Sequence, residues 1–146
     1  SVEFKYGSYG YIAKKNLGTA ESALQFDADA VTSYSQQAVE KILKQYLQLT
    51  YFQPDIEDIL HTHKLRILVR KAEIAELSKF NKEITELSDY YFDGRYPGIG
   101  YEEVTSEKAK TLFIAARNIV AIVESKIGKL QQVKSSESGL QNLKLF

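Results

Sequence analysis

The chain has 146 residues, the size of one domain, since this length buries one sizeable core and rarely two. It contains no cysteine and no run of roughly 18 apolar residues, which excludes disulfides, thiolate zinc sites and a membrane-spanning helix, and we expect a cytoplasmic protein. Its 19 basic and 19 acidic side chains balance, which argues against a protein that binds duplex DNA through general attraction to phosphate.

Apolar residues recur at helical spacing along most of the chain, and its only prolines are Pro54 and Pro97. We therefore predict an all-α protein, a five-helix antiparallel up-and-down bundle over residues 1–130 with an extended C-terminal tail over residues 131–146. The tail begins as a polar linker. It ends in apolar residues that we expect to dock on the bundle or on a neighbouring molecule: Leu140, Leu143, Leu145 and Phe146.

The first two helices are predicted at about residues 8–26 and 30–50. Gly10 and Gly18 should weaken the first helix, because a glycine in a helix costs about 1 kcal/mol relative to alanine. Its expected core residues are Tyr9, Ile12, Leu17, Ala20 and Leu24. The second helix has a broader apolar stripe, which indicates a central position in the bundle. This stripe consists of Val31, Tyr34, Ala38, Ile42, Leu43, Tyr46, Leu47 and Leu49.

Three further helices follow in the sequence. The third is predicted at about residues 62–72, with Thr62 as its N-cap. The fourth ends before Gly94 and Pro97, and the fifth begins with the capping segment 105–108 and runs to about residue 130. The apolar ladder of the fourth helix consists of Leu77, Phe80, Ile84, Leu87 and Tyr91.

The second helix also carries a group of polar residues. Gln36 lies at the edge of the apolar stripe, where a buried amide needs hydrogen-bond partners. Glu40, Lys41 and Lys44 lie on the opposite, wetter side of the helical wheel. The simplest interpretation is a solvated face in which Glu40 and Lys44 form an ion pair worth a few tenths of a kcal/mol.

The two histidines, His61 and His63, are separated by one residue, a spacing that could contribute to a metal site. Two imidazoles without further ligands make a weak motif, since a closed zinc site typically takes four. We expect His63 to cap a helix or to bond a buried backbone group. The acidic residues Glu86, Asp89 and Asp93 favour a solvated face over a cation site. We therefore predict no metal and no cofactor.

The segment 90–97 presents Arg95 between aromatic residues. A guanidinium group can pair bidentately with a phosphate, and Tyr96 can stack on a base. This segment is the strongest phosphate or RNA site predicted from the sequence. The alternative, with about equal weight, is that Arg95 caps the end of the fourth helix and pairs with Asp89 or Asp93.

Three short segments, 34–44, 61–65 and 93–97, resemble in this order the HEPN domain (higher eukaryotes and prokaryotes nucleotide-binding). The resemblance covers residues 11–130. It implies a helical bundle that handles RNA, nucleotides or a minimal nucleotidyltransferase partner, often as a homodimer and as half of a toxin–antitoxin pair. It also implies that Gln36 and Lys41 lie beside the arginine loop and that His63 lines the same site.

Ribonucleases of the HEPN family carry a histidine that follows the arginine after four to six residues. The corresponding positions after Arg95 hold Gly100, Tyr101 and Glu102, so the usual proton carrier is missing there. The sequence therefore favours a noncatalytic module that binds a nucleotide, an RNA phosphate or a partner protein. Its predicted site consists of Arg95, Tyr96, Lys41, His63 and Gln36. Two alternatives stay open: a divergent ribonuclease that uses Arg95 and His63, and a purely structural assembly domain.

Overall fold

The computed structural model describes residues 2–90 and 103–138, and within these residues all regular structure is helical. The helices described are α1 (Tyr9–Ser22), α2 (Ala28–Thr50), α3 (Ile56–His61), α4 (Leu65–Ala72), the 3-10 helix η1 (Ala75–Phe80), α5 (Asn81–Ser88) and α6 (Ser106–Ser138). The predicted all-α class is confirmed. Within the described ranges, no helix combines the length and the apolar character needed to cross a membrane.

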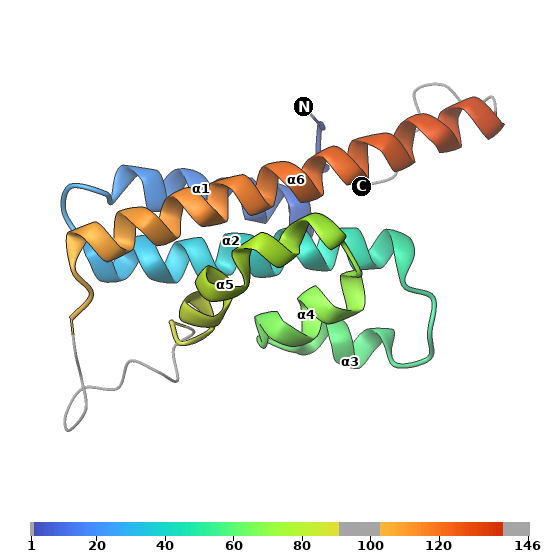
Figure 1. The fold of residues 1–146 in the computed structure, drawn as a ribbon. Helices are drawn as coiled ribbons and strands as arrows, with labels where there is room; N and C mark the ends of the chain where they lie inside the picture. The colour runs from blue at the N-terminus through green and yellow to red at the C-terminus, as the bar shows by residue number, and fades with distance from the viewer. Residues whose placement is uncertain (1, 91–102, 139–146) are drawn as a thin grey trace.

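Helix α2 is the central element and contacts α1, α3, α4, α5 and α6 (Figure 1). Helix α1 runs antiparallel to α2, and the backbone N–H of Gly10 near its start donates to Oε1 of Gln45 near the end of α2, at 2.9 Å. Helix α6 runs in the same direction as α2. Its start is tied to the start of α2, where the N–H of Val104 donates to Oδ1 of Asp29 at 3.3 Å.

The helix count differs from the predicted five, because the described residues contain six α-helices and η1. Helix α3 occupies a segment that was predicted as a connection, and its six residues are too short for periodicity to identify it. It buries Ile59 and Leu60. Thr62, the predicted cap of the third helix, is instead the C-cap of α3. The predicted fourth helix is divided into η1 and α5.

The C-terminal end of the bundle also differs from the prediction. Residues 131–138 continue α6 in place of the expected linker. This stretch contains neither glycine nor proline, so a polar composition that suits a linker suits a solvated helix equally well. Figure 1 shows the last turns of α6 projecting past the other helices. The docking prediction for Leu140, Leu143, Leu145 and Phe146 lies outside the described residues.

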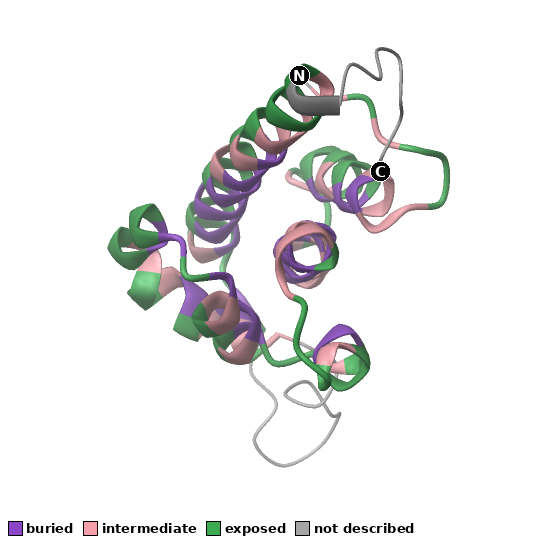
Figure 2. Ribbon diagram, turned by 90° about the vertical axis from the view of Figure 1, so that its right-hand side faces the viewer, coloured by how far each residue is buried: buried purple, intermediate pink, exposed green. Residues whose placement is uncertain are grey.

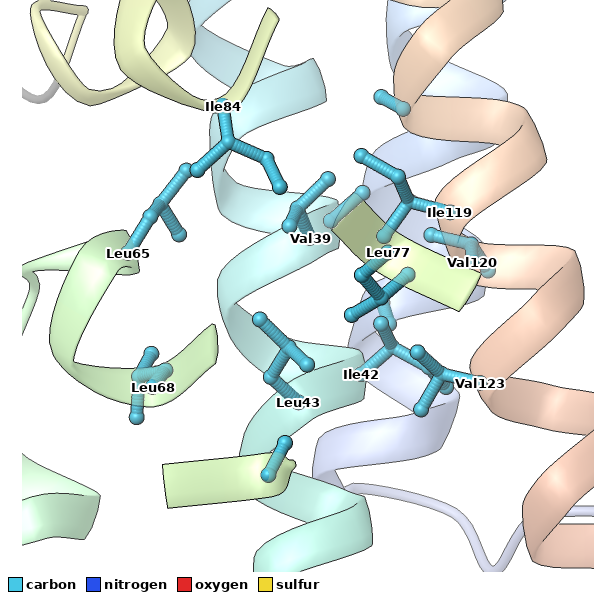
Figure 3. Packing of buried hydrophobic residues seen from close by; sticks show 14 of the residues in the cluster. Val39, Ile42, Leu43, Leu65, Leu68, Leu77, Ile84, Ile119, Val120 and Val123 are labelled. Atoms are coloured by element: carbon cyan, nitrogen blue, oxygen red, sulfur yellow. The ribbon is translucent and has the colours of Figure 1, made fainter. Parts of the chain in front are cut away.

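The core forms where α2 faces α6 on one side and α4 and α5 on the other. Figure 3 shows the aliphatic side chains that meet there, and in Figure 2 the buried residues line the interior while the outward faces are exposed. The labelled core residues are Val39, Ile42, Leu43, Leu65, Leu68, Leu77, Ile84, Ile119, Val120 and Val123. All of them are less than one-tenth exposed, and most of the α2 stripe expected from the sequence is buried too.

The buried face of α1 is rotated from the predicted one. Tyr9, Ile12, Leu17 and Leu24 are only half-buried. Ala20 is buried as predicted, and the other buried positions of α1 are Gly10, Ala13 and Asn16. Small side chains let α1 lie close to α2, and a Cβ atom at Gly10 would overlap the ring of Phe4. Gly10 is thus a packing requirement of the N-terminal segment.

Candidate functional site

A row of polar residues runs along the interior side of α2. Gln36, Glu40 and Lys44 follow each other at intervals of four residues, so they lie on one face of the helix. Their exposed fractions are 0%, 1% and 2%, respectively. The expectation of a wet face was therefore wrong for Glu40 and Lys44. The reason is the central position of α2. Neighbouring elements pack against most of its circumference, whereas an amphipathic surface helix keeps one face in solvent.

Glu40 is the common partner of four side chains. Nζ of Lys41 donates to Oε2 at 2.7 Å, and Nζ of Lys44 donates to the same oxygen at 3.0 Å. Nε2 of Gln36 donates to Oε1 at 3.2 Å. Nδ1 of His63, which lies between α3 and α4, is 3.2 Å from Oε1 and 3.3 Å from Oε2. The predicted Glu40–Lys44 pair exists, but as the centre of a buried cluster.

Burial and the neighbouring charges shift the pKa values of Glu40 and Lys44. Burial by itself raises the pKa of Glu40, but the hydrogen bonds and positive charges of Lys41 and Lys44 outweigh it and hold that pKa below its ordinary value. Burial lowers the pKa of Lys44, and its bond to Glu40 opposes that shift. The carboxylate therefore stays ionised at neutral pH and binds both ammonium groups.

One carboxylate faces two ammonium groups in this cluster, which leaves a surplus of positive charge. The Lys44 side chain is 3% exposed, and its Nζ lies 5.9 Å from the centroid of the Tyr9 ring. The side chains of Lys41 and His63 are 22% and 43% exposed. An anion that arrives from solvent can therefore reach Lys41 and His63, with Lys44 as a fixed positive charge behind them.

A family profile for the HEPN domain matches residues 9–126, which is most of the chain. The chain belongs to the HEPN domain family. Membership confirms the resemblance seen in the sequence and makes the chain a nucleotide- or RNA-related module in general. A search of curated proteins and a search of solved structures found no significant match.

The HEPN match includes two segments that the fold brings together. Residues 34–44 supply Gln36, Glu40, Lys41 and Lys44, and residues 61–65 supply His63. The imidazole of His63 bonds a carboxylate 23 positions earlier in the chain. The expected backbone partner is therefore not the group that its Nδ1 contacts. Because an ionised carboxylate only accepts hydrogen bonds, we assign the hydrogen of the His63 ring to Nδ1.

Only one end of the Gln36 amide group has the hydrogen-bond partner that the sequence predicted it to need. Its Nε2 donates to Glu40, but among the residues described its Oε1 has no hydrogen-bond donor. An unpaired buried acceptor costs about 1–3 kcal/mol. In this HEPN domain Gln36 therefore positions Glu40 from inside the bundle and does not itself reach the surface.

The remaining predicted residues of the HEPN site cannot be placed beside the cluster. Arg95 and Tyr96 lie outside the described residues, and so does the proposed pairing of Arg95 with Asp89 or Asp93. His61 contacts the Glu57 carbonyl oxygen through Nδ1 at 2.6 Å. In the described ranges, no group of three or more histidine, aspartate or glutamate side chains is arranged to hold a metal ion.

Sequence reasoning missed the central role of Glu40 and the contribution of Tyr9. The interval of four residues between Gln36, Glu40 and Lys44 was visible, and it could have suggested a buried polar row because α2 was already expected to be central. Tyr9 gave no such signal, because its contact with Lys44 joins residues 35 positions apart in the chain.

Proposed function

We propose that this HEPN domain is a noncatalytic module that binds the phosphate of a nucleotide or an RNA. One observation carries the proposal: Glu40 binds two lysines, so positive charge is left over where Lys41 and His63 meet solvent. The Lys41 ammonium group has three hydrogens, and the bond to Glu40 uses one of them. In this proposal Arg95 and Tyr96 add a guanidinium group and a stacking face.

The fold supports the proposal by fixing the cations in advance. Lys44 is held by Glu40 on one side and by the Tyr9 ring on the other. Lys41 is held by the same carboxylate. Because these positions are set before a ligand arrives, little side-chain order is lost on binding. The cluster is therefore more than the solvated surface face expected from the sequence.

Fluorescence anisotropy with labelled single-stranded RNA and with labelled ATP tests the proposal. We expect Lys41→Gln to weaken binding roughly 10- to 100-fold, since a charge-assisted hydrogen bond contributes about 1.5–3 kcal/mol. Lys110→Gln is the matched control, because Lys110 is an exposed lysine on α6. Equal affinity of the two variants would contradict the proposal. Absence of binding by the unmodified protein would favour the purely structural assembly domain.

A second candidate function, a divergent ribonuclease, has one observation in its favour. The Glu40 carboxylate holds the Nδ1 side of His63, as the carboxylate of a catalytic triad holds its histidine. Such a contact fixes the orientation of the ring. If this function is correct, purified protein cleaves a structured RNA, and His63→Ala or Arg95→Ala abolishes cleavage. Binding without cleavage supports the noncatalytic module.

The resemblance also implied a homodimer, a minimal nucleotidyltransferase partner and a place in a toxin–antitoxin pair, and these stay predictions. We propose the homodimer as the state in which the protein binds its ligand. Light scattering at micromolar concentration measures it directly, and a monomer mass would contradict it. Co-expression with an adjacent nucleotidyltransferase gene tests the partner, since a stable complex should co-purify.

A further inference from the structure

A cavity of about 780 Å³ lies between the start of α1, the second half of α2 and α3. Its volume is within the range of roughly 300–1,000 Å³ that is typical of small-ligand sites. Six of its lining residues define its chemistry: Tyr9, Ile12, Gln45, Gln48, Ile56 and Leu60. None of them belongs to the residues predicted from the sequence as a site.

The cavity and the lysine cluster are neighbours on α2 and share Tyr9. Gln45 follows Lys41 by four residues on α2, and Gln48 follows Lys44 by four, so each amide neighbours a lysine on the same helix face. The Tyr9 ring belongs to both places, because it lines the cavity and lies 5.9 Å from Nζ of Lys44. A ligand with its anionic end at Lys41 can therefore extend along α2 into the cavity.

The lining of the cavity suits a flat, uncharged heteroaromatic ring. Ile12, Ile56 and Leu60 supply apolar walls, and Tyr9 supplies an aromatic ring. Among the described residues that line it, the opposite charges of Lys5 and Glu57 offset each other. The cavity therefore lacks the surplus positive charge of the lysine cluster and offers little attraction to a second phosphate.

Two amides lie at the edge of this cavity. Oε1 of Gln45 accepts from the N–H of Gly10, and Nε2 of Gln45 donates to Oε1 of Gln48 over a long 3.4 Å. Gln45 is thus fixed and buried, whereas Gln48 is exposed and can turn toward a ligand. An amide carries both donors and an acceptor, the combination that reads the edge of a nucleobase.

We propose that the cavity binds the nucleobase of a ligand whose phosphate lies at Lys41 and His63. This inference rests on the proposed phosphate-binding function and adds to it a base-binding subsite formed by Tyr9, Gln45 and Gln48. The base can come from a free nucleotide or from single-stranded RNA, because both present an unpaired base next to a phosphate. A base inside a duplex cannot enter.

The test compares ligands with and without a base. Fluorescence-competition binding is measured for ATP and inorganic triphosphate, and for a five-nucleotide RNA and an abasic ribose-phosphate chain of the same length. We expect the base-bearing ligand of at least one pair to bind about tenfold more tightly. An advantage confined to ATP identifies a free nucleotide as the source, and one confined to the RNA identifies single-stranded RNA.

Gln48→Trp is the variant that fills the cavity. Because Gln48 is exposed, the larger ring can be added without overpacking the core, and circular dichroism and thermal melting check the fold. We expect it to remove the advantage of the base while the affinity for triphosphate stays unchanged. Gln25→Trp, at another exposed glutamine, is the matched control and should keep that advantage.

The outcomes separate the two proposals. If ligands with and without a base bind equally, and Gln48→Trp changes the affinity of neither kind of ligand, the base-binding subsite is wrong. The phosphate site at Lys41 still stands in that case. If the unmodified protein binds none of the four probes, the proposed function fails together with this inference. Gln48→Ala gives a second readout, because it opens the cavity and should reduce discrimination between bases without reducing triphosphate binding.

Discussion

The negative charge of Glu40 lies inside the bundle, within hydrogen-bond distance of the Lys41 and Lys44 ammonium groups and of the His63 ring. Glu40→Gln keeps the size of the side chain but leaves the buried Lys44 without a counter-charge. Removing one partner of a buried ion pair costs roughly 3–5 kcal/mol, and we expect a loss of that size in the free energy of unfolding in urea. Unchanged stability would contradict the buried cluster.

The matched control is Glu76→Gln. Glu76 pairs with Lys126 at 2.6 Å, but its side chain is 48% exposed, so water screens the pair and the substitution should leave stability unchanged. Comparing the two variants separates the effect of burial from the effect of removing a glutamate.

The pH dependence of the same two proteins checks the sign of this effect. The pKa of Glu40 in the folded state lies below its ordinary value of 4.5, so near that pH the unfolded chain binds more protons. The stabilisation is therefore present above pH 4.5 and is lost as the pH falls through the lowered value. We expect the stability difference between the protein and Glu40→Gln to shrink in acid. A constant difference would argue against an ionised Glu40.

At the scale of one element, α1 contains two glycines with opposite consequences. In Gly10→Ala the new methyl group would overlap the Phe4 ring, whereas at Gly18 no described atom lies within 4 Å of the added Cβ. Gly18→Ala should therefore stabilise the protein by about 0.5–1 kcal/mol, the usual gain in helix propensity. Gly10→Ala should destabilise it despite the same gain. Thermal and urea unfolding measure both.

The Phe4→Ala background provides the control for this pair. Once the ring is removed, the added methyl group at position 10 meets no aromatic neighbour, and the cost of Gly10→Ala should disappear. The two substitutions share one contact, so their effects are expected to be non-additive. Additive effects would show that Gly10→Ala acts through something other than Phe4.

At the scale of the whole molecule, the balance of 19 basic and 19 acidic side chains makes any nucleic-acid contact local. For single strands, the logarithm of the binding constant falls with the logarithm of salt concentration by about 0.7 per phosphate neutralised. The surplus charge of the Glu40 cluster, with Arg95 added, should neutralise one or two phosphates. We therefore expect a slope magnitude below about 2.

The same charge balance predicts that duplex DNA does not compete for the site at physiological salt. Anisotropy titrations over a series of salt concentrations, with RNA and duplex DNA measured in parallel, give both results. A steep slope or tight duplex binding would contradict this prediction, because it would indicate a broad basic surface.

The sequence by itself determined the helical class and the long helices α2 and α6, because their apolar periodicity is local and extends over many turns. It also determined the capping segment 105–108, where Oγ1 of Thr105 accepts from the N–H of Lys108 at 3.1 Å. The HEPN resemblance, later confirmed, rested on short segments that can be read in order along the chain. Local pattern was sufficient for these features because neighbours in sequence create them.

Only the tertiary structure decided that Glu40 and Lys44 are buried and that His63 joins them. Periodicity on one helix shows which residues share a face, but other elements decide how many faces are covered. The start of α1 and the segment between α3 and α4 close over the polar side of α2, and both come from distant parts of the chain. The sequence pattern therefore indicated a wet surface at the place where packing encloses a charged cluster.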